Sequence, residues 1–217
     1  MTATTSAEKP AREQHQRLGT LGKALDWRLD RLQREYLKAA PAARADLARL
    51  RRGVGKPAGS VPEIWELTVG AVPEELARDD DDPSWAEQAV HAAMTLYAVH
   101  QQSLDIPAHV PGVSFGQAVG RLSAHDDRSK EAVTRRFMAV ATAESIDELL
   151  THARGLITQL RAARQGMDYA RFADDVWGLL TPAGAQRVRL AWGRSFYRTK
   201  PSSSDDSTDE SATNDPE

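Results

Sequence analysis

Apolar residues recur at spacings of three and four along most of the chain, a pattern typical of amphipathic helices. One stripe consists of Leu18, Leu21, Leu25, Leu29, Leu32 and Tyr36. The strongest helix is expected over residues 146–164, because its apolar residues fall within about 60° of one line at 100° per residue. No stretch shows sustained alternation of β-branched and polar residues. The sequence therefore predicts an all-α fold.

Capping signals mark where several of these helices begin. A Ser followed three residues later by Glu or Gln forms a capping box, and this occurs at Ser84–Glu87, Ser114–Gln117 and Ser145–Glu148. Asp168 is expected to cap another helix, Pro62 to open a helix through residues 65–69, and Thr181-Pro182 to open the last one. The five Trp residues mostly fall on apolar stripes, so we expect them in the core: Trp27, Trp65, Trp85, Trp177 and Trp192.

Proline placement and composition suggest how the helices are grouped. Residues 106–112 contain Pro107 and Pro111 and are the clearest candidate for a domain boundary. We expect two helical lobes of about four to five helices each, over residues 12–110 and 111–200. Residues 1–11 and 201–217 are polar and aperiodic, so both are predicted to be disordered tails.

The charge is distributed unevenly. Residues 201–217 carry six acids and no bases, which leaves 28 bases against 25 acids in the rest of the chain. Arginine dominates the bases, and its planar fork of donors suits phosphate groups. A GC-rich genome is the alternative explanation for the arginine content, and a solubilising role is the simpler interpretation of the acidic tail.

Motifs for catalysis and metal binding are weak. The chain has no cysteine, which excludes disulfides, thiolate metal sites and a cysteine nucleophile. The sequence Gly112-Val113-Ser114-Phe115-Gly116 fits a hydrolase nucleophile elbow, but a proline-broken loop precedes it and Ser114 is already explained as a helix cap. His125-Asp126 resembles a phosphohydrolase metal pair but lacks companion ligands at suitable spacing. We expect no enzyme activity, no cofactor and no metal ion. With no signal peptide or apolar membrane span, we expect a cytoplasmic protein.

Arginine positions point to a different chemistry. Four pairs stand seven residues apart and so share a helix face: Arg44/Arg51, Arg128/Arg135, Arg154/Arg161 and Arg187/Arg194. Few have an acid at i±4, so as a set they favour a surface that follows phosphates over simple helix ion pairing. The candidate nucleic-acid-binding residues are Arg49, Arg51, Arg52, Arg121, Arg128, Lys130, Arg135, Arg136, Arg154 and Arg161.

The order and spacing of several segments resemble the CasB family. The matching stretches are LARLRRG at 47–53, LYAVHQQS at 96–103, SFGQAVGRL at 114–122, RRFMAV at 135–140, ELLTHARGLITQLR at 148–161 and MDYARFADDVWGL at 167–179, with the Pro62-to-Trp65 helix start between the first two. The resemblance runs from about Leu25 to Tyr197. The acidic tail and the run Asp79–Asp82 are not part of it.

The resemblance implies a non-catalytic, two-lobed helical small subunit of the type I-E CRISPR Cascade complex, present in two copies. Such a subunit would contact the backbone and large subunits of a crRNA-guided complex and the displaced single-stranded DNA of the R-loop. The alternative is a helical adaptor whose arginines serve protein contacts alone. A metal-dependent phosphohydrolase built on His125-Asp126 is a distant third hypothesis.

Overall fold

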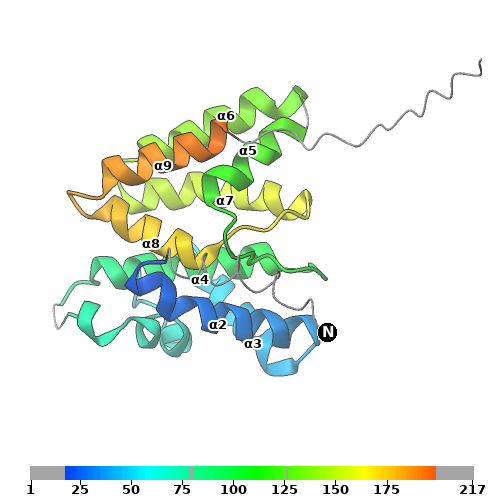
Figure 1. The fold of residues 1–217 in the computed structure, drawn as a ribbon. Helices are drawn as coiled ribbons and strands as arrows, with labels where there is room; N and C mark the ends of the chain where they lie inside the picture. Colours follow the sequence, from blue (N-terminus) through cyan, green and yellow to red (C-terminus); the bar gives the residue numbers. More distant parts are fainter. Residues whose placement is uncertain (1–17, 79–80, 126, 199–217) are drawn as a thin grey trace, which may run out of the picture.

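The computed structural model describes residues 18–78, 81–125 and 127–198. Within these ranges the secondary structure is helical, no strand is present, and a single isolated β-bridge joins His109 and Met167 (Figure 1). The all-α prediction is confirmed. The α-helices are α2 (Thr20–Leu37), α3 (Pro41–Arg52), α4 (Trp85–Gln101), α5 (Phe115–His125), α6 (Asp127–Thr142), α7 (Ile146–Ala162), α8 (Tyr169–Leu180) and α9 (Ala185–Tyr197). Three short 3₁₀ turns follow α3: Pro62–Leu67, Val69–Ala71 and Glu74–Leu76.

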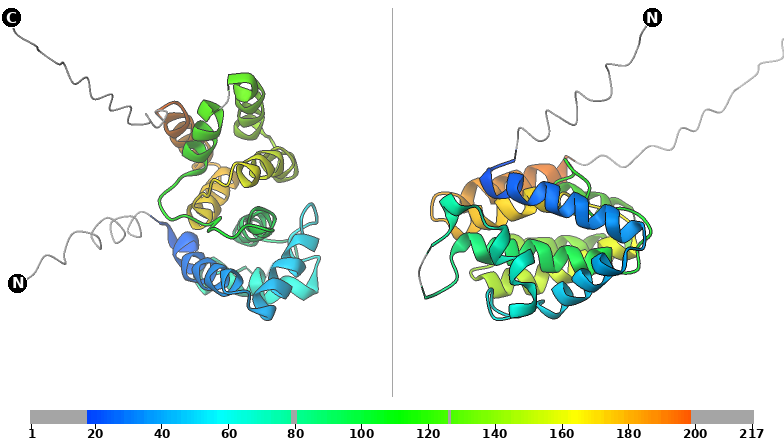
Figure 2. Two further views of the ribbon diagram at one scale, coloured as in Figure 1. Left: turned by 90° about the vertical axis from the view of Figure 1, so that its right-hand side faces the viewer. Right: turned by 90° about the horizontal axis from the view of Figure 1, so that it is seen from below.

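The helices lie in layers. α2 and α3 form one outer layer with the 3₁₀ turns, and α5, α6 and α9 form the opposite one (Figures 1 and 2). α7 contacts both α4 and α6, while α8 contacts α2, α4 and α9. Buried apolar residues from every α-helix join in one continuous core. The predicted division into lobes 12–110 and 111–200 stays a prediction, and the two predicted tails lie outside the described residues.

The predicted helix starts are largely confirmed. The Ser84 hydroxyl accepts the Glu87 N–H at 3.2 Å, and the Glu87 carboxylate accepts the Ser84 N–H at 2.7 Å, which completes a capping box. Ser114 and Ser145 each accept the N–H three residues later, also at 3.2 Å. These contacts satisfy N–H groups that a helix start otherwise leaves unpaired.

Two expected helix starts differ from the structure. The segment after Pro62 forms a 3₁₀ turn rather than a longer helix, and Thr68 ends it. The last helix begins at Ala185, not at Thr181-Pro182, because the Thr181 N–H bonds to the carbonyls of Trp177 and Gly178 and so ends α8 instead.

The prediction that tryptophans belong to the core is correct for Trp192 and wrong for three others. Trp192 is buried, whereas Trp27, Trp65 and Trp85 are 52%, 49% and 43% exposed. Helical spacing places a residue near the apolar stripe, but whether a neighbouring element covers it depends on tertiary packing. No described element fully covers α2 at Trp27, the first 3₁₀ turn at Trp65, or the first residue of α4, Trp85.

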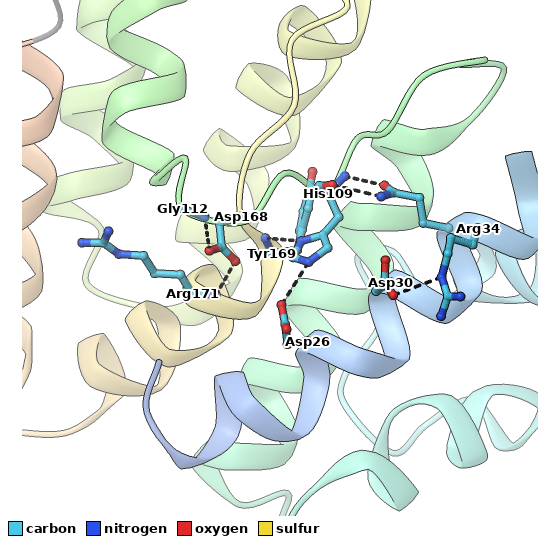
Figure 3. Close-up of polar contacts among 9 residues, drawn as sticks. Asp26, Asp30, Arg34, His109, Gly112, Asp168, Tyr169 and Arg171 are labelled. Carbon is cyan, nitrogen blue, oxygen red and sulfur yellow. Dashed lines mark hydrogen bonds and ion pairs between the residues drawn. The ribbon is translucent and has the colours of Figure 1, made fainter. Parts of the chain in front are cut away.

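The segment between α4 and α5 is held by buried hydrogen bonds, which Figure 3 shows around His109. His109 Nδ1 accepts the Tyr169 N–H at 3.1 Å, so Nε2 carries the proton of the neutral ring and donates to Asp26 at 3.3 Å. The Gln33 amide pairs with the backbone N–H and carbonyl of His109 at 2.7 and 3.0 Å. This segment therefore connects α2 to the start of α8.

Asp168 and the backbone beside it extend this connection. The Asp168 carboxylate accepts the Arg171 N–H, which caps α8 as predicted, and also the Gly112 N–H at 2.8 Å (Figure 3). The Val110 N–H donates to the Met167 carbonyl, and the Met167 N–H donates to the Ala108 carbonyl. Backbone hydrogen bonds thus fix the proline-containing stretch against the segment that directly precedes α8.

A carboxylate from α8 caps α2 across 152 to 155 residues of sequence. Gly19 and Gly22 carry no capping side chain, and their N–H groups donate to Asp174 at 2.7 and 2.8 Å. A Cβ on Gly22 would lie 2.2 Å from the Asp174 carboxylate, so glycine is needed for this approach. Asp174 therefore ties the first described helix to α8.

The first prediction concerns this long-range cap. Asp174→Ala removes the acceptor for both N–H groups, and we expect the free energy of unfolding to fall by about 1–2 kcal/mol. Asp174→Asn keeps one acceptor oxygen and should lose less. Urea unfolding measures both variants, with the exposed Glu131→Ala on α6 as a control. Equal stability of Asp174→Ala and the wild type would contradict the capping role.

The second prediction concerns pH. Burial raises the pKa of Asp175 to about 6, although the hydrogen bond from Trp192 Nε1 at 2.7 Å opposes this. Because the carboxyl is more acidic in the unfolded chain, its stabilising contribution is complete below about pH 4 and is lost as the pH rises through 6. Asp175→Asn stays neutral and should be more stable than the wild type at pH 7, by about 2 kcal/mol. Unfolding at pH 4 and pH 7 tests this, since a stability difference that is the same at both values would contradict it.

Candidate nucleic-acid interface

An arginine of α6 packs against α7 at a glycine. The two helices form an antiparallel pair joined by the short turn at residues 143–145. A Cβ on Gly155 would lie 3.1 Å from Cδ and 3.2 Å from Nε of Arg136, so the Arg136 side chain runs across α7 at this position. The next residue toward the start of α7 is the exposed Arg154. Helix–helix packing thus places the Arg136 side chain against α7 one residue away from Arg154, which lies 18 residues later in the sequence.

A lysine in the loop after α3 lies in the same hollow as Arg154. Lys56 and Arg154 line one hollow between α4, α7 and the loop after α3, with apolar walls from Pro57, Leu96 and Leu150. Asp147 also lines this hollow and is its one carboxylate in the described part. No ion pair is formed by Lys56, Arg136 or Arg154 with any described carboxylate. These cations are therefore available to an external anion.

His91 holds the Lys56 loop against α4. Its Nε2 donates to the Gly53 carbonyl at 3.0 Å, and the ring is 3% exposed. Burial lowers the pKa of His91, so the ring is neutral at physiological pH and adds no charge to the surface. A Cβ on Gly53 would lie 2.7 Å from Ile64, which shows how closely the loop approaches the first 3₁₀ turn. The buried ring therefore positions a charged loop.

We call Lys56, Arg135, Arg136 and Arg154 the α6–α7 surface. Arg135 is exposed beside Arg136 on α6 and has no ion pair with a described carboxylate. The sequence prediction named the three arginines of this surface but missed Lys56. Two sequence signals mark this surface. Gly53 and Gly55 stand on either side of a short turn that carries the backbone before Lys56 close to α4, and Gly155, a glycine in the middle of a strong helix, marks the approach of Arg136.

Arg161 lies further along α7 and is tied to α4. Its Nη1 donates to the Val99 carbonyl at 3.4 Å and to Gln102 Oε1 at 3.3 Å. Arg161 and Arg154 stand two turns apart, about 10 Å along the helix. The side chain of Arg161 is therefore partly engaged in joining α7 to the end of α4.

The arginines of α3 are more strongly neutralised than the sequence suggested. Arg49 forms an ion pair with Asp46, and Arg52 Nη1 lies 4.0 Å from Glu63 Oε1. Arg51 is half-buried. The spacing rule used for the prediction considered acids at i±4, whereas Asp46 is three residues before Arg49 and Glu63 comes from the 3₁₀ turn. No described contact joins these arginines to the α6–α7 surface.

The remaining predicted residues lie apart from the α6–α7 surface, or their side chains lie outside the described part of the chain. Arg121 is exposed on α5, and no described contact connects it to the cations of α7. Lys130 is exposed near the start of α6. The side chain of Arg128 lies outside the described part. Of the ten predicted residues, Arg136 packs against α7 one residue from Arg154, and Arg135 precedes Arg136 on α6.

The competing chemical motifs find little support in the structure. Ser114 is the cap of α5, as expected, and not a nucleophile elbow. Asp126 and the side chain of His125 lie outside the described residues. Among the residues that are described, no cluster of three or more His, Asp or Glu side chains is placed to hold a metal ion. None of the helices within the described ranges has both the length and the apolar character that a bilayer crossing requires.

Comparison with solved structures finds relatives of known fold. CasB from Thermobifida fusca is 36% identical, with a TM-score of 0.67 over 83% of this chain and 99% of that chain. A CRISPR-associated protein of the Cse2 family from Thermus thermophilus is 24% identical, with a TM-score of 0.60 over 83% and 99% of the two chains. CasB from M. ruber is 21% identical, with a TM-score of 0.53 over 71% and 84%. The last two support the fold alone.

Comparisons with curated proteins and with protein-family models complete the picture. No curated protein matches the chain in the corresponding search. The family model described as CRISPR-associated protein Cse2 matches residues 46–197, which include α7 and the arginines of the α6–α7 surface. Together with the similarity to the Thermobifida protein, this match shows that the chain belongs to the CRISPR-associated Cse2 (CasB) family.

Proposed function

We propose that this Cse2-family chain is a non-catalytic small subunit of a type I-E CRISPR Cascade complex that binds the nucleic-acid backbone of the R-loop. The displaced non-target strand is the intended ligand, and the α6–α7 surface is the site. One observation carries the proposal: Arg136 runs across Gly155 next to Arg154, and Arg154 shares a hollow with Lys56, all without ion pairs to described carboxylates.

The physical demands of the task match such a surface. In a guided complex the RNA reads sequence by base pairing, so an accessory subunit needs only contacts that every nucleotide offers. Phosphates offer such contacts, and arginine binds them through two parallel hydrogen bonds. Strand exchange is nearly balanced in free energy, so a few contacts to the displaced strand are sufficient to favour the open state.

The apolar walls of the hollow add a second kind of contact. Pro57, Leu96 and Leu150 lie beside Lys56 and Arg154. A base or sugar that follows a bound phosphate would cover these side chains without being read by hydrogen bonds. Arg135, Arg121 and Lys130 would extend the path along α6 and α5, while Arg49 and Arg52 would first have to leave their carboxylates.

Exposed tryptophans support contacts with other subunits. Trp27 on α2 and Trp65 on the first 3₁₀ turn are each about half exposed, and aromatic residues are enriched at protein interfaces. Both belong to the outer layer opposite α5, α6 and α9 (Figure 1). The chain would thus bind polynucleotide and protein with different elements. We retain two copies per complex as a proposal that the family resemblance implies.

The third prediction is a salt dependence. If the four cations of the α6–α7 surface each neutralise one phosphate of single-stranded DNA, log K should fall against log salt with a slope of about −3. Affinity should then fall by roughly 50-fold between 50 and 200 mM salt. Fluorescence anisotropy with a labelled single strand measures this slope. A slope near zero would exclude a phosphate-binding surface.

The fourth prediction is a pair of matched variants. Arg135→Glu combined with Arg136→Glu should weaken single-strand binding more than tenfold, because two contacts are lost and two repulsive charges are added. The control, Arg31→Glu with Arg34→Glu on α2, makes the same change in net charge on another layer. These control arginines are ion-paired with Glu35 and Asp30.

The variants distinguish the proposal from the adaptor alternative. Binding should fall in the α6 variant and remain within about twofold in the control, with both melting temperatures close to the wild type. Equal losses in the two variants would indicate a general charge effect. If neither variant lost DNA binding but the α6 variant failed to join the complex, the arginines would serve protein contacts and the adaptor function would be correct.

A further inference from the structure

The outward face of α9 carries charge that the α6–α7 surface does not include. Arg187, Arg194 and Arg198 lie within about 40° of one another around the helix axis, at 100° per residue. All three are exposed, and none forms an ion pair with a carboxylate in the described part of the chain. Arg189 is different, because its Nη2 donates to the Ala143 carbonyl at 3.3 Å and so joins α9 to the end of α6.

Two large apolar side chains stand beside these arginines. Leu190 is 51% exposed and Tyr197 is 70% exposed, the largest exposed fraction among the large apolar residues of the described part. Both fall within about 80° of Arg187, while Val188, Trp192 and Phe196 point to the opposite side and are buried. The result is a stripe of three cations with an apolar edge, which we call the α9 face.

We propose that the acidic residues 205–217 of the same chain bind the α9 face. This segment contains six acids and no bases, in the order Asp205, Asp206, Asp209, Glu210, Asp215 and Glu217. It begins seven residues after Arg198 and is therefore the nearest strongly acidic segment in the sequence. Carboxylates are acceptors for arginine, and the charges of the two partners are opposite in sign.

The length of the connecting chain permits this contact. Arg187 and Arg198 are about 16 Å apart along the helix. The seven steps from Arg198 to Asp205 span at most about 24 Å, so a chain that turns back along α9 can place Asp205 beside any of the three arginines. A short tether of this kind gives an effective concentration in the millimolar range, which compensates for the weakness of each exposed ion pair.

The contact has a consequence for nucleic-acid binding. α9 lies next to α6, with Phe196 stacked on Phe137 at 4.4 Å between ring centroids. Phe196 lies on the side of α9 opposite the α9 face, so a tail bound there would act on the α6–α7 surface only through the longer-range repulsion of its six negative charges, which is strongest at low salt. A polynucleotide that approaches the α6–α7 surface would be repelled by the charge of the tail. This consequence rests on the proposed function, whereas the contact itself does not.

Energy transfer within the chain tests the contact without DNA. Because the chain has no cysteine, labels can be attached at Ala183→Cys, in the turn before α9, and at Ala212→Cys in the tail. We expect transfer efficiency to fall by at least about half between 50 and 500 mM salt, because screening weakens exposed ion pairs. Replacing the six acids by Asn and Gln, or combining Arg187→Glu with Arg194→Glu, should lower the transfer at 50 mM salt to the high-salt value.

Two controls make the result specific. A label at Lys38→Cys, at the end of α2 in the opposite layer, should show a much smaller salt dependence with the same tail label. Equal salt dependence from both positions would indicate general compaction and overturn the proposal. Transfer that does not change with salt, or that is unaffected by the α9 substitutions, would also overturn it.

A binding experiment separates this proposal from the proposed function. If both are correct, the neutralised tail should raise affinity for single-stranded DNA about three- to tenfold at low salt. That gain should disappear in the Arg187→Glu/Arg194→Glu background. If energy transfer is sensitive to salt but the chain does not bind DNA, the tail contact is supported and the proposed function is wrong. If DNA binding depends on the α9 arginines but energy transfer does not change with salt, the α9 face binds polynucleotide and the proposed tail contact is wrong.

Discussion

The buried contacts of His109 are the constraint on which the arrangement of the helices depends. A neutral imidazole accepts a backbone N–H at the start of α8 and donates to Asp26 on α2, while Gln33 fixes the backbone on either side of the ring. An unpaired polar group at this depth would cost about 1–3 kcal/mol, so these partners must remain in place. α8 is thereby anchored between the outer layers, and α7, which leads into it, is held with its cationic edge next to α4.

Local sequence signals predicted much of the fold because helices obey local rules. The apolar stripes of α2 and α7, the capping box at Ser84 and the cap at Asp168 all depend on residues within one or two turns. The proline-rich stretch at 106–112 shows where such rules stop. Its prolines and glycine predict a domain boundary, which stays a prediction, but they give no sign that this backbone pairs with Met167 and Asp168, more than 50 residues away.

The candidate site was only partly predictable for the same reason. Arg135, Arg136 and Arg154 were named from helical spacing, but the approach of Arg136 to α7 depends on Gly155. Lys56 lines the same hollow as Arg154, in a loop that His91 holds on α4. Arg49 and Arg52 were named on the same grounds and are paired with carboxylates. Exposed tryptophans were likewise assigned to the core, since a sequence shows an apolar stripe but not which element covers it.

We propose that cations from α6, α7 and the Lys56 loop lie on one surface and hold a nucleic-acid strand regardless of its sequence. Photo-cross-linking tests it most directly, with a photoreactive residue in place of Thr151, which lines the hollow with Lys56 and Arg154. We expect cross-links from position 151 to single strands of unrelated sequence. These cross-links should be lost when Arg154→Glu is added and absent when the photoreactive residue replaces Lys38 at the end of α2. Equal cross-linking from both positions, or none at Thr151 under conditions where DNA is bound, would contradict it.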